Sequence, residues 1–384
     1  MLKGAYEYMK ASVITIFDNN NYGSMLQTYA TQTLFSKYGV ETEFVDYIRP
    51  HMTDEAKIEQ RLQSSKYKNP FFLWLIRLQK QRTLNAEKKV LRAFLSENVR
   101  LSPLTYHSFE ELYQNPPDAD FYCTGSDQTW NSFWNQGVDR SFFLDFAPEG
   151  KPRIALSSSM GKTEMSDGEK DEMVQLWNRY QYITVREKSA EELLRSNGIE
   201  AHTILDPTLL LTKNEWEKLA SPRMVSEPYI LVYKLHKGHK NVDFDDYVDC
   251  VKKVTGMKVV KLCFQKQDRG HADKDFVLPK VVDFLSLIRY ATIVISDSFH
   301  ATSFSINFHT NFEVILPDAF TTRIENILEI TDLKKSIVQS MNQAAESKDI
   351  NYDEVEKRLN EARKLSIQEV EKALHKAGVK GIDV

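Results

Sequence analysis

The chain has 384 residues, which is long enough for two or three domains at about 150 residues each. Hydrophobic residues make up 42% of it, so a sizeable core can form and extensive disorder is excluded. The net charge of −4 argues against nucleic-acid binding through a generally basic surface.

The sequence shows no sign of a membrane span, a signal peptide, a disulfide framework or a zinc site. No apolar run approaches the roughly 18 residues that a membrane span needs, and charged residues interrupt the opening segment where a signal peptide would be apolar. Cys123, Cys250 and Cys263 lie far apart without metal-ligand spacing, so neither a disulfide framework nor a zinc site is expected. These features predict a soluble cytoplasmic protein.

The first predicted elements alternate between strand and helix. Residues 11–17 form a short β-branched strand that a polar turn closes, and residues 25–38 show helical spacing that stops at Gly39. Residues 40–48 then form the next strand. This order predicts a parallel α/β sheet. Further strands are predicted over 121–125, 153–159, 182–187, 229–235, 258–264 and 292–297, with helices over 168–180 and 189–198.

The strands fall into two runs, which predicts two domains. We expect an N-terminal domain over 1–185 and a second domain over 186–340, entered through ILDPTLLLTKNEWEKL. Residues 341–384 are predicted to form charged amphipathic C-terminal helices.

Residues 57–100 are basic, with eleven Lys or Arg against three Asp or Glu. One interpretation is a solvated helical insertion in the first domain with one face packed on the body. The other is a basic amphipathic surface that touches an anionic membrane or a lipid-linked substrate. The second interpretation would place the protein at the inner face of the membrane.

Several familiar motifs are missing or weak. The stretch around Gly161 lacks the first glycine of a phosphate-binding loop, and no GxGxxG follows a strand. Residues 243–245 (DFD) resemble a metal-binding pattern but read better as the polar start of a helix. His236 and His239 are predicted to lie in a solvated loop without a carboxylate beside them.

The stretch 293–308 gives the strongest sign of a site. A buried strand gives way to a helix that Ser296, Asp297 or Ser298 can cap. Ligands of open α/β sheets bind at the carboxyl ends of strands, where a helix N-terminus attracts anions.

His300 lies in the first turn of that predicted helix. A neighbouring anion would favour its protonated form and make it a proton donor. The alternative is a structural histidine that packs beside Phe299 and Phe304. Arg186 and Arg323 follow a strand and open a helix respectively, so each could bind an anion or pair with a neighbouring acid.

Two loops of the first domain combine polar and aromatic groups, the mixture that carbohydrate sites use. The alternative interpretation is that these residues only form turns, because Asn, Gly and Asp are also common turn residues. The candidate acceptor-binding residues are Asn21, Tyr22, Gly23, Asp127, Gln128 and Trp130.

Five separated blocks together resemble the polysaccharide pyruvyl transferase family. They are FDNNNYGSMLQTYA, DADFYCTGSDQTWN, ITVREKSAEELLRSNGI, LDPTLLLTKNEWEKL and ISDSFHATSFSINF, and the resemblance covers about residues 11–335. It implies an α/β fold of the glycosyltransferase B type, with two Rossmann-like domains facing across a cleft. It also implies transfer of pyruvate from phosphoenolpyruvate onto two sugar hydroxyls, which forms a cyclic ketal and releases phosphate.

The resemblance implies roles for individual residues. His300 would act in catalysis and Arg186 would bind phosphoenolpyruvate. Some members carry an arginine two positions before this histidine, where this chain has Ser298. The serine hydroxyl, Arg323 and Lys234 would compensate for that missing charge, and Phe299 would support the site.

The resulting hypothesis is a pyruvyl transferase of exopolysaccharide or capsule synthesis. Its partners would be phosphoenolpyruvate and a sugar acceptor, which could be lipid-linked; neither a metal nor an organic cofactor is needed. The first domain would hold the acceptor and the second phosphoenolpyruvate. The alternatives are a nucleotide-sugar glycosyltransferase on the same architecture and a non-catalytic carbohydrate-binding protein.

Overall fold

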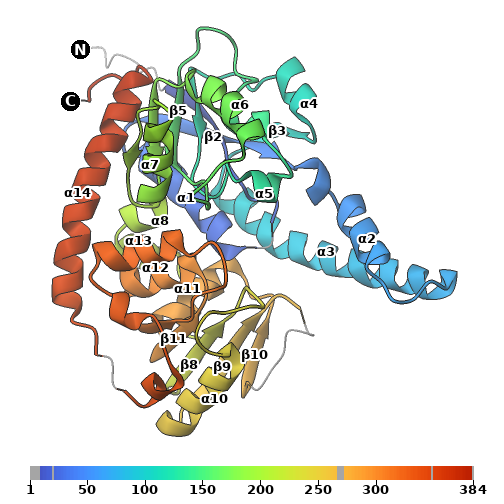
Figure 1. Cartoon of the computed structure of the whole chain (residues 1–384), viewed down its shortest axis with the longest axis vertical. Helices are drawn as coiled ribbons and strands as arrows, with labels where there is room; N and C mark the ends of the chain where they lie inside the picture. Colours follow the sequence, from blue (N-terminus) through green and yellow to red (C-terminus); the bar gives the residue numbers. More distant parts are fainter. Residues whose placement is uncertain (1–8, 20, 266–271, 347–348, 383–384) are drawn as a thin grey trace, which may run out of the picture. The chain divides into compact units, whose positions relative to one another are not determined.

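The computed structural model describes residues 9–19, 21–265, 272–346 and 349–382. The chain divides into two compact units, of which the first comprises residues 1–207 and 366–384 and the second residues 208–365. Each unit contains one parallel sheet with helices packed on it, so the predicted α/β class and the two sheets are confirmed (Figure 1).

The first unit is built on a seven-stranded sheet in the order β3-β2-β1-β4-β5-β6-β7, and all its pairings are parallel. Its order reverses between β1 and β4, which is where ligands bind in open α/β sheets. The strands are β1 (Met9–Ile14), β2 (Val40–Tyr47), β3 (Leu101–Tyr106), β4 (Phe121–Thr124), β5 (Arg153–Ser158), β6 (Tyr182–Val185) and β7 (His202–Thr203).

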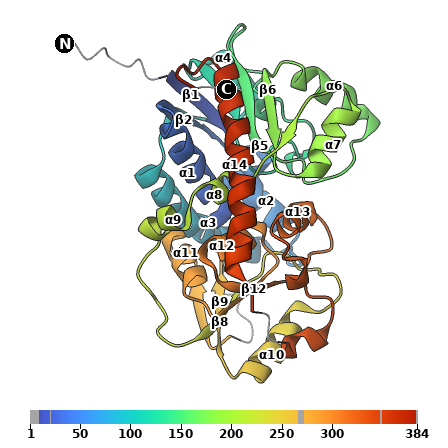
Figure 2. The same cartoon turned by 90° about the vertical axis from the view of Figure 1, so that its left-hand side faces the viewer.

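Helices connect these strands, and α1 packs along β2 (Figure 2). The helices and 3-10 turns of this unit are α1 (Tyr22–Ser36), η1 (Pro50–Met52), α2 (Asp54–Gln63), α3 (Pro70–Asn98), α4 (Phe109–Gln114), α5 (Ser132–Asn135), η2 (Arg140–Phe143), α6 (Asp167–Trp177) and α7 (Lys188–Ser196). The short helix α8 (Pro207–Leu210) begins at the last residue of this part of the first unit and continues into the second.

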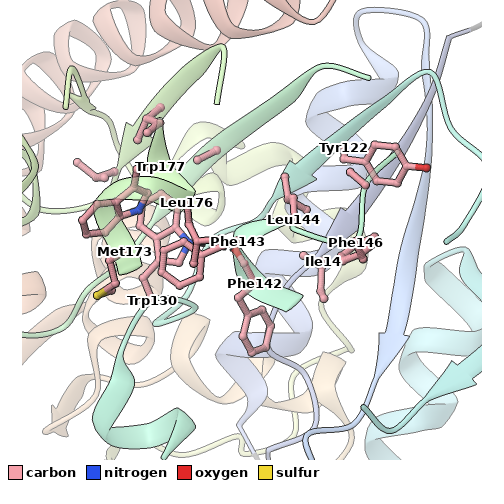
Figure 3. Close-up of a cluster of buried hydrophobic side chains, with 14 of the residues drawn as sticks. Ile14, Tyr122, Trp130, Phe142, Phe143, Leu144, Phe146, Met173, Leu176 and Trp177 are labelled. Carbon is pink, nitrogen blue, oxygen red and sulfur yellow. Dashed lines mark hydrogen bonds between the residues drawn. The ribbon is translucent and has the colours of Figure 1, made fainter. Parts of the chain in front are cut away.

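An aromatic cluster forms a large part of the first unit's core (Figure 3). The Trp130 ring stacks on Phe143 at 5.7 Å between centroids, and Trp177 meets Trp130 edge-on at 5.6 Å. The Trp130 indole N–H donates to the Phe142 carbonyl at 3.0 Å, so its one polar atom is satisfied. Burial of each such ring contributes about 1.5–3 kcal/mol, which makes this cluster a main source of the unit's stability.

The second unit has a five-stranded parallel sheet in the order β10-β9-β8-β11-β12, reversing between β8 and β11. Its strands are β8 (Tyr229–Tyr233), β9 (Lys258–Cys263), β10 (Lys274–Val277), β11 (Ile293–Ser296) and β12 (Asn311–Val314). Its helices and 3-10 turns are α9 (Lys213–Leu219), α10 (Phe244–Thr255), α11 (Val281–Arg289), α12 (Phe299–Phe308), α13 (Thr322–Ile330), η4 (Lys334–Ser336) and η5 (Met341–Ala345).

The structure draws the boundary between the units later than the sequence predicts. Residues 186–207 were expected in the second domain, but β7 pairs with β6 and so extends the first sheet. The predicted C-terminal helices are a single long helix, α14 (Tyr352–Lys376), preceded by η5. Residues of α14 up to 365 belong to the second unit, and those from 366 belong to the first.

The basic stretch 57–100 is helical, as predicted, but only part of it packs on the first unit. The buried side chains of α3 all lie in its second half, from Leu84 onward. Figure 1 shows α2 and the first turns of α3 standing out from the sheet of that unit. Among the residues that the structure describes, no helix is long and apolar enough to cross a membrane.

Candidate functional site

The carboxyl edge of the second sheet is shaped by hydroxyl groups at the end of β11. Ser296 donates its hydroxyl to the Tyr233 carbonyl at 2.6 Å and accepts the Ser298 N–H at 3.1 Å. Ser298 is the N-cap of α12, because its hydroxyl accepts the Ala301 N–H at 3.3 Å. The prediction that one of these polar residues caps the helix is therefore confirmed, and that residue is Ser298.

His300 is the second residue of α12, at the carboxyl end of β11. Its side chain is only 3% exposed, and its ring meets the Phe299 ring nearly at right angles, with centroids 5.1 Å apart. The contact with Phe299 that a structural histidine would make is thus present. A substrate can reach the imidazole only after the side chains that cover it move aside.

Arg323 and His300 both contact Phe299. Arg323 is the second residue of α13 and is half-buried, and its guanidinium carbon lies 5.9 Å from the centre of the Phe299 ring. Phe299 therefore contacts both the imidazole and a cation. A cation over an aromatic face is stabilised by the ring quadrupole, so this arrangement holds positive charge beside the start of α12.

The prediction that His236 and His239 have no carboxylate beside them is wrong, because both lie against Asp297. Its buried carboxylate accepts the N–H groups of Leu235 at 2.7 Å and His236 at 2.8 Å, and it bonds His239 Nε2 at 2.9 Å. His236 Nδ1 lies 3.3 Å from the same carboxylate. Burial alone would raise the pKa of Asp297, but the hydrogen bonds from the histidines lower it below its ordinary value.

Lys234 is engaged with side chains of α10. Its ammonium forms an ion pair with Asp245 at 2.9 Å and lies 5.1 Å from the centre of the Phe244 ring, both on α10. The neighbouring Asp243 caps α10 by accepting the N–H groups of residues 245 and 246. The interpretation of residues 243–245 as a helix start is therefore confirmed.

In the first unit, Arg186 lies in a buried polar network at the carboxyl edge of the sheet. Its guanidinium donates to Asp206 at 2.8 Å and to Asp127 at 3.5 Å. Ser126 donates to Asp206 at 2.6 Å, and Ser24 donates to Asp127 at 2.7 Å. Burial by itself lowers the pKa of Arg186, but the two carboxylates raise it above its ordinary value, so the group stays charged.

The predicted acceptor residues of the first unit come together only in part. Trp130 lies in the aromatic core and Tyr22 is fully buried, so neither ring is available as a surface for a sugar; the aromatic mixture reflects packing. Asn21 caps α1 by accepting the Gly23 N–H at 2.9 Å, and it stays partly exposed. Gln128, also partly exposed, accepts from Asn131 at 2.7 Å.

A cavity of about 260 Å³ lies at the carboxyl ends of β1 and β2 and was not predicted. Its lining includes Phe17, Asp18 and Asn19 after β1, and Lys57, Glu87 and Lys88 from α2 and α3. The only signal in the sequence was the polar turn after β1. Lys57 donates to the Asp18 carbonyl at 3.1 Å, and burial lowers the pKa of its ammonium. Carboxylate, amide and ammonium groups together with apolar side chains in one lining suit a polar, uncharged ligand such as a sugar.

Solved structures of similar fold are two-unit α/β proteins of the glycosyltransferase B type. The UDP-N-acetylglucosamine 2-epimerase of Rickettsia bellii aligns with a TM-score of 0.51 at 10% identity, over 95% of this chain and 96% of its own. UGT71G1 of Medicago truncatula, complexed with UDP-glucose, aligns with a TM-score of 0.51 at 9% identity, over 99% of this chain and 100% of its own. At these identities the likeness defines the fold alone.

The family follows from the sequence itself. Residues 21–318 match the profile described as "Polysaccharide pyruvyl transferase", and the chain belongs to that family. Its members are transferases of polysaccharide synthesis, which implies a sugar or polysaccharide acceptor. No curated protein sequence matches the chain.

Proposed function

We propose that the protein transfers pyruvate from phosphoenolpyruvate onto two hydroxyls of a sugar, in a polysaccharide or its lipid-linked precursor. The observation that carries the proposal is the pairing of a proton donor with a cation at the carboxyl edge of the second sheet. There His300, in the first turn of α12, and Arg323, in the first turn of α13, both contact Phe299. The reaction would take place in the cytoplasm and would serve exopolysaccharide or capsule synthesis.

The chemistry needs a proton donor and a cation. A donor adds a proton to the methylene carbon of phosphoenolpyruvate, and the adjacent carbon becomes electrophilic. One sugar hydroxyl attacks that carbon, the bond to the phosphate oxygen breaks, and the second hydroxyl closes the ketal. The hydroxyls lose two protons, of which one replaces the donor's proton and the other leaves with phosphate. We assign the donor role to His300.

We assign the binding of the phosphoenolpyruvate anion chiefly to Arg323. Ser298 stands where some family members carry an arginine, and its hydroxyl is engaged with the Ala301 N–H. Lys234 would join the site only by leaving Asp245. An anion at Arg186 would have to displace Asp206 or Asp127, so direct binding by Arg186, which the resemblance implies, stays a prediction.

The acceptor is assigned to the first unit. The cavity beside Asp18 and Asn19 supports this assignment better than the buried rings of Tyr22 and Trp130. Asn21, Gly23, Asp127 and Gln128 stay candidates at the same edge of the sheet, where the strand order reverses.

Two measurements test the proposal. Calorimetry should show that phosphoenolpyruvate binds, and phosphate release should depend on an added saccharide acceptor. Changing His300→Ala should lower the rate by on the order of 10²–10⁴, whereas the exposed His375→Ala on α14 should leave it unchanged. Near-normal turnover in His300→Ala would refute the donor role.

The first alternative is a nucleotide-sugar glycosyltransferase, since UGT71G1 of the same fold was solved with UDP-glucose. Titration with UDP-glucose and UDP-N-acetylglucosamine in parallel with phosphoenolpyruvate separates the two. Heat from a sugar nucleotide alone would favour this alternative, and heat from a saccharide alone would favour a non-catalytic binding protein.

A further inference from the structure

The first turns of α3 carry a continuous group of exposed aromatic rings. Phe71 is 61% exposed and Trp74 is 53% exposed. Ring centroids lie 5.4 Å apart between Tyr67 and Phe72, 5.9 Å between Phe71 and Phe72, and 6.1 Å between Phe71 and Trp74. Exposed apolar side chains are ordinary when scattered, but a contiguous group of this size marks an interaction surface.

The exposed apolar residues follow helical spacing. Phe71, Trp74, Leu75 and Leu78 are three, four and seven positions apart, so they line one face of α3. The buried residues of the same helix begin at Leu84. The first half of α3 therefore presents its apolar face to solvent, and only the second half packs on the first unit.

Cations accompany the apolar face, and carboxylates are absent from the segment. Between residues 60 and 86 the sequence holds no Asp or Glu. We call the following set the aromatic–basic surface: Tyr67, Phe71, Phe72, Trp74, Leu75 and Leu78, with Arg61, Lys66, Lys68, Arg77, Lys80 and Arg82.

This combination matches an anionic bilayer surface. Aromatic rings favour the level of the lipid headgroups, while Lys and Arg are attracted to anionic lipids. A helix with one apolar face and a basic remainder lies in the plane of the interface. A second copy of the chain fits poorly, because pairing two such surfaces would bring six cations against six.

We propose that the aromatic–basic surface docks the protein on an anionic phospholipid membrane. Of the two interpretations of residues 57–100, this one explains why the apolar side chains lie on the exposed half of α3. The inference does not depend on pyruvyl transfer, since any activity on a membrane-linked acceptor would gain from docking.

The test is sedimentation of the full-length protein with vesicles. The protein should bind to phosphatidylcholine vesicles that contain phosphatidylglycerol, and it should bind much less to vesicles of phosphatidylcholine alone. Binding should weaken as the salt concentration is raised. Arg77→Glu, Lys80→Glu and Arg82→Glu together should weaken binding by about 100-fold or more. Phe71→Ser, Trp74→Ser and Leu75→Ser together should weaken it at least about tenfold.

Matched controls lie on α14, outside the aromatic–basic surface. Lys357→Glu with Lys364→Glu removes two exposed cations, and Leu365→Ser removes a side chain that is 60% exposed; both should bind as the unchanged protein does. Circular dichroism should show unchanged helix content in every variant.

Tryptophan fluorescence supplies a second readout. Trp74 and Trp134 are the exposed tryptophans, so in a Trp134→Phe background brominated lipid should quench Trp74. Equal binding by the serine variant, or no quenching, would overturn the proposal. The proposal would also be overturned if analytical ultracentrifugation showed that the protein self-associates and that the serine variant does not. The aromatic–basic surface would then bind a second copy of the chain. Loss of binding with phosphate release intact would leave the proposed function standing.

Discussion

Arg186 presents its guanidinium at the carboxyl edge of the first sheet, between the buried carboxylates of Asp127 and Asp206. Changing Arg186→Met should lower the free energy of unfolding by about 3–5 kcal/mol, because Asp127 and Asp206 would be left as buried charges without their cation. Urea unfolding measures this loss.

The matched change Arg323→Met separates binding from stability. Its guanidinium lies over Phe299 and is half-buried, whereas that of Arg186 is fully buried, so the free energy of unfolding should fall by less than in Arg186→Met. Phosphoenolpyruvate affinity should fall by roughly tenfold or more, measured by calorimetry. If a stable Arg186→Met protein lost affinity instead, the direct role that the family resemblance implies for Arg186 would be supported.

Asp297 makes the second unit sensitive to acid. The hydrogen bonds from His236 and His239 lower its pKa in the folded protein below the unfolded value. Its contribution to the free energy of unfolding is therefore present above the unfolded pKa, and it is lost as pH falls through the folded pKa.

An Asp297→Asn variant should show this directly. It should be less stable by about 1–3 kcal/mol near neutral pH, and the difference from the unchanged protein should shrink between about pH 5 and pH 2. The control Asp245→Asn removes only an exposed ion pair with Lys234, so it should change the stability near neutral pH by less than about 1 kcal/mol. A constant difference for Asp297→Asn across the acid range would contradict the pKa assignment.

At the scale of elements, two glycines beside the sheet of the first unit should respond in opposite directions to alanine. Gly161 has a φ of +62°, and a Cβ there would clash with the side-chain amide of Gln128. Gly161→Ala should therefore destabilise by about 1–2 kcal/mol or more. Gly168 is on α6 with nothing within 4 Å of an added Cβ, so Gly168→Ala should stabilise by about 0.5–1 kcal/mol. Urea midpoints decide the signs.

The strands that the sequence predicted are the inner strands of the two sheets. β4, β5 and β8 are buried along their whole length and gave clear signals. β3 and β10 were missed because they are edge strands with exposed positions, and β3 also contains a proline. Burial on one side only leaves too few apolar positions to distinguish a short strand from a loop.

The candidate site was predictable where its residues are adjacent and unpredictable where they are distant. The cap at Ser298 and the position of His300 follow from a strand that leads directly into a helix. Asp297 is about 60 residues from its histidine partners, at separations of 58 and 61, and no local pattern encodes that pairing. Trp130 shows the reverse error, since a ring within a polar loop turned out to belong to the core.

For the whole molecule, the first unit contains both the beginning and the end of the chain. The last part of α14 is joined to it by polar contacts: Ser366 accepts the Leu205 N–H at 3.0 Å, and Tyr38 donates to Glu371 at 3.1 Å. The same part of the helix also buries Val370 and Leu374 completely. The first unit should therefore depend on residues that follow the second unit in the sequence.

Two leucines of α14 test this dependence with the same substitution. Leu374→Ala removes a fully buried side chain and should lower the stability of the first unit by about 2–5 kcal/mol, whereas Leu365→Ala, 60% exposed, should change it by less than about 0.5 kcal/mol. Hydrogen exchange should show faster exchange in β5 and β6 of the Leu374→Ala protein, with β8 and β11 unchanged. Equal loss of protection in all four strands would mean that the two units unfold together, and that the end of α14 supports the molecule as one cooperative body.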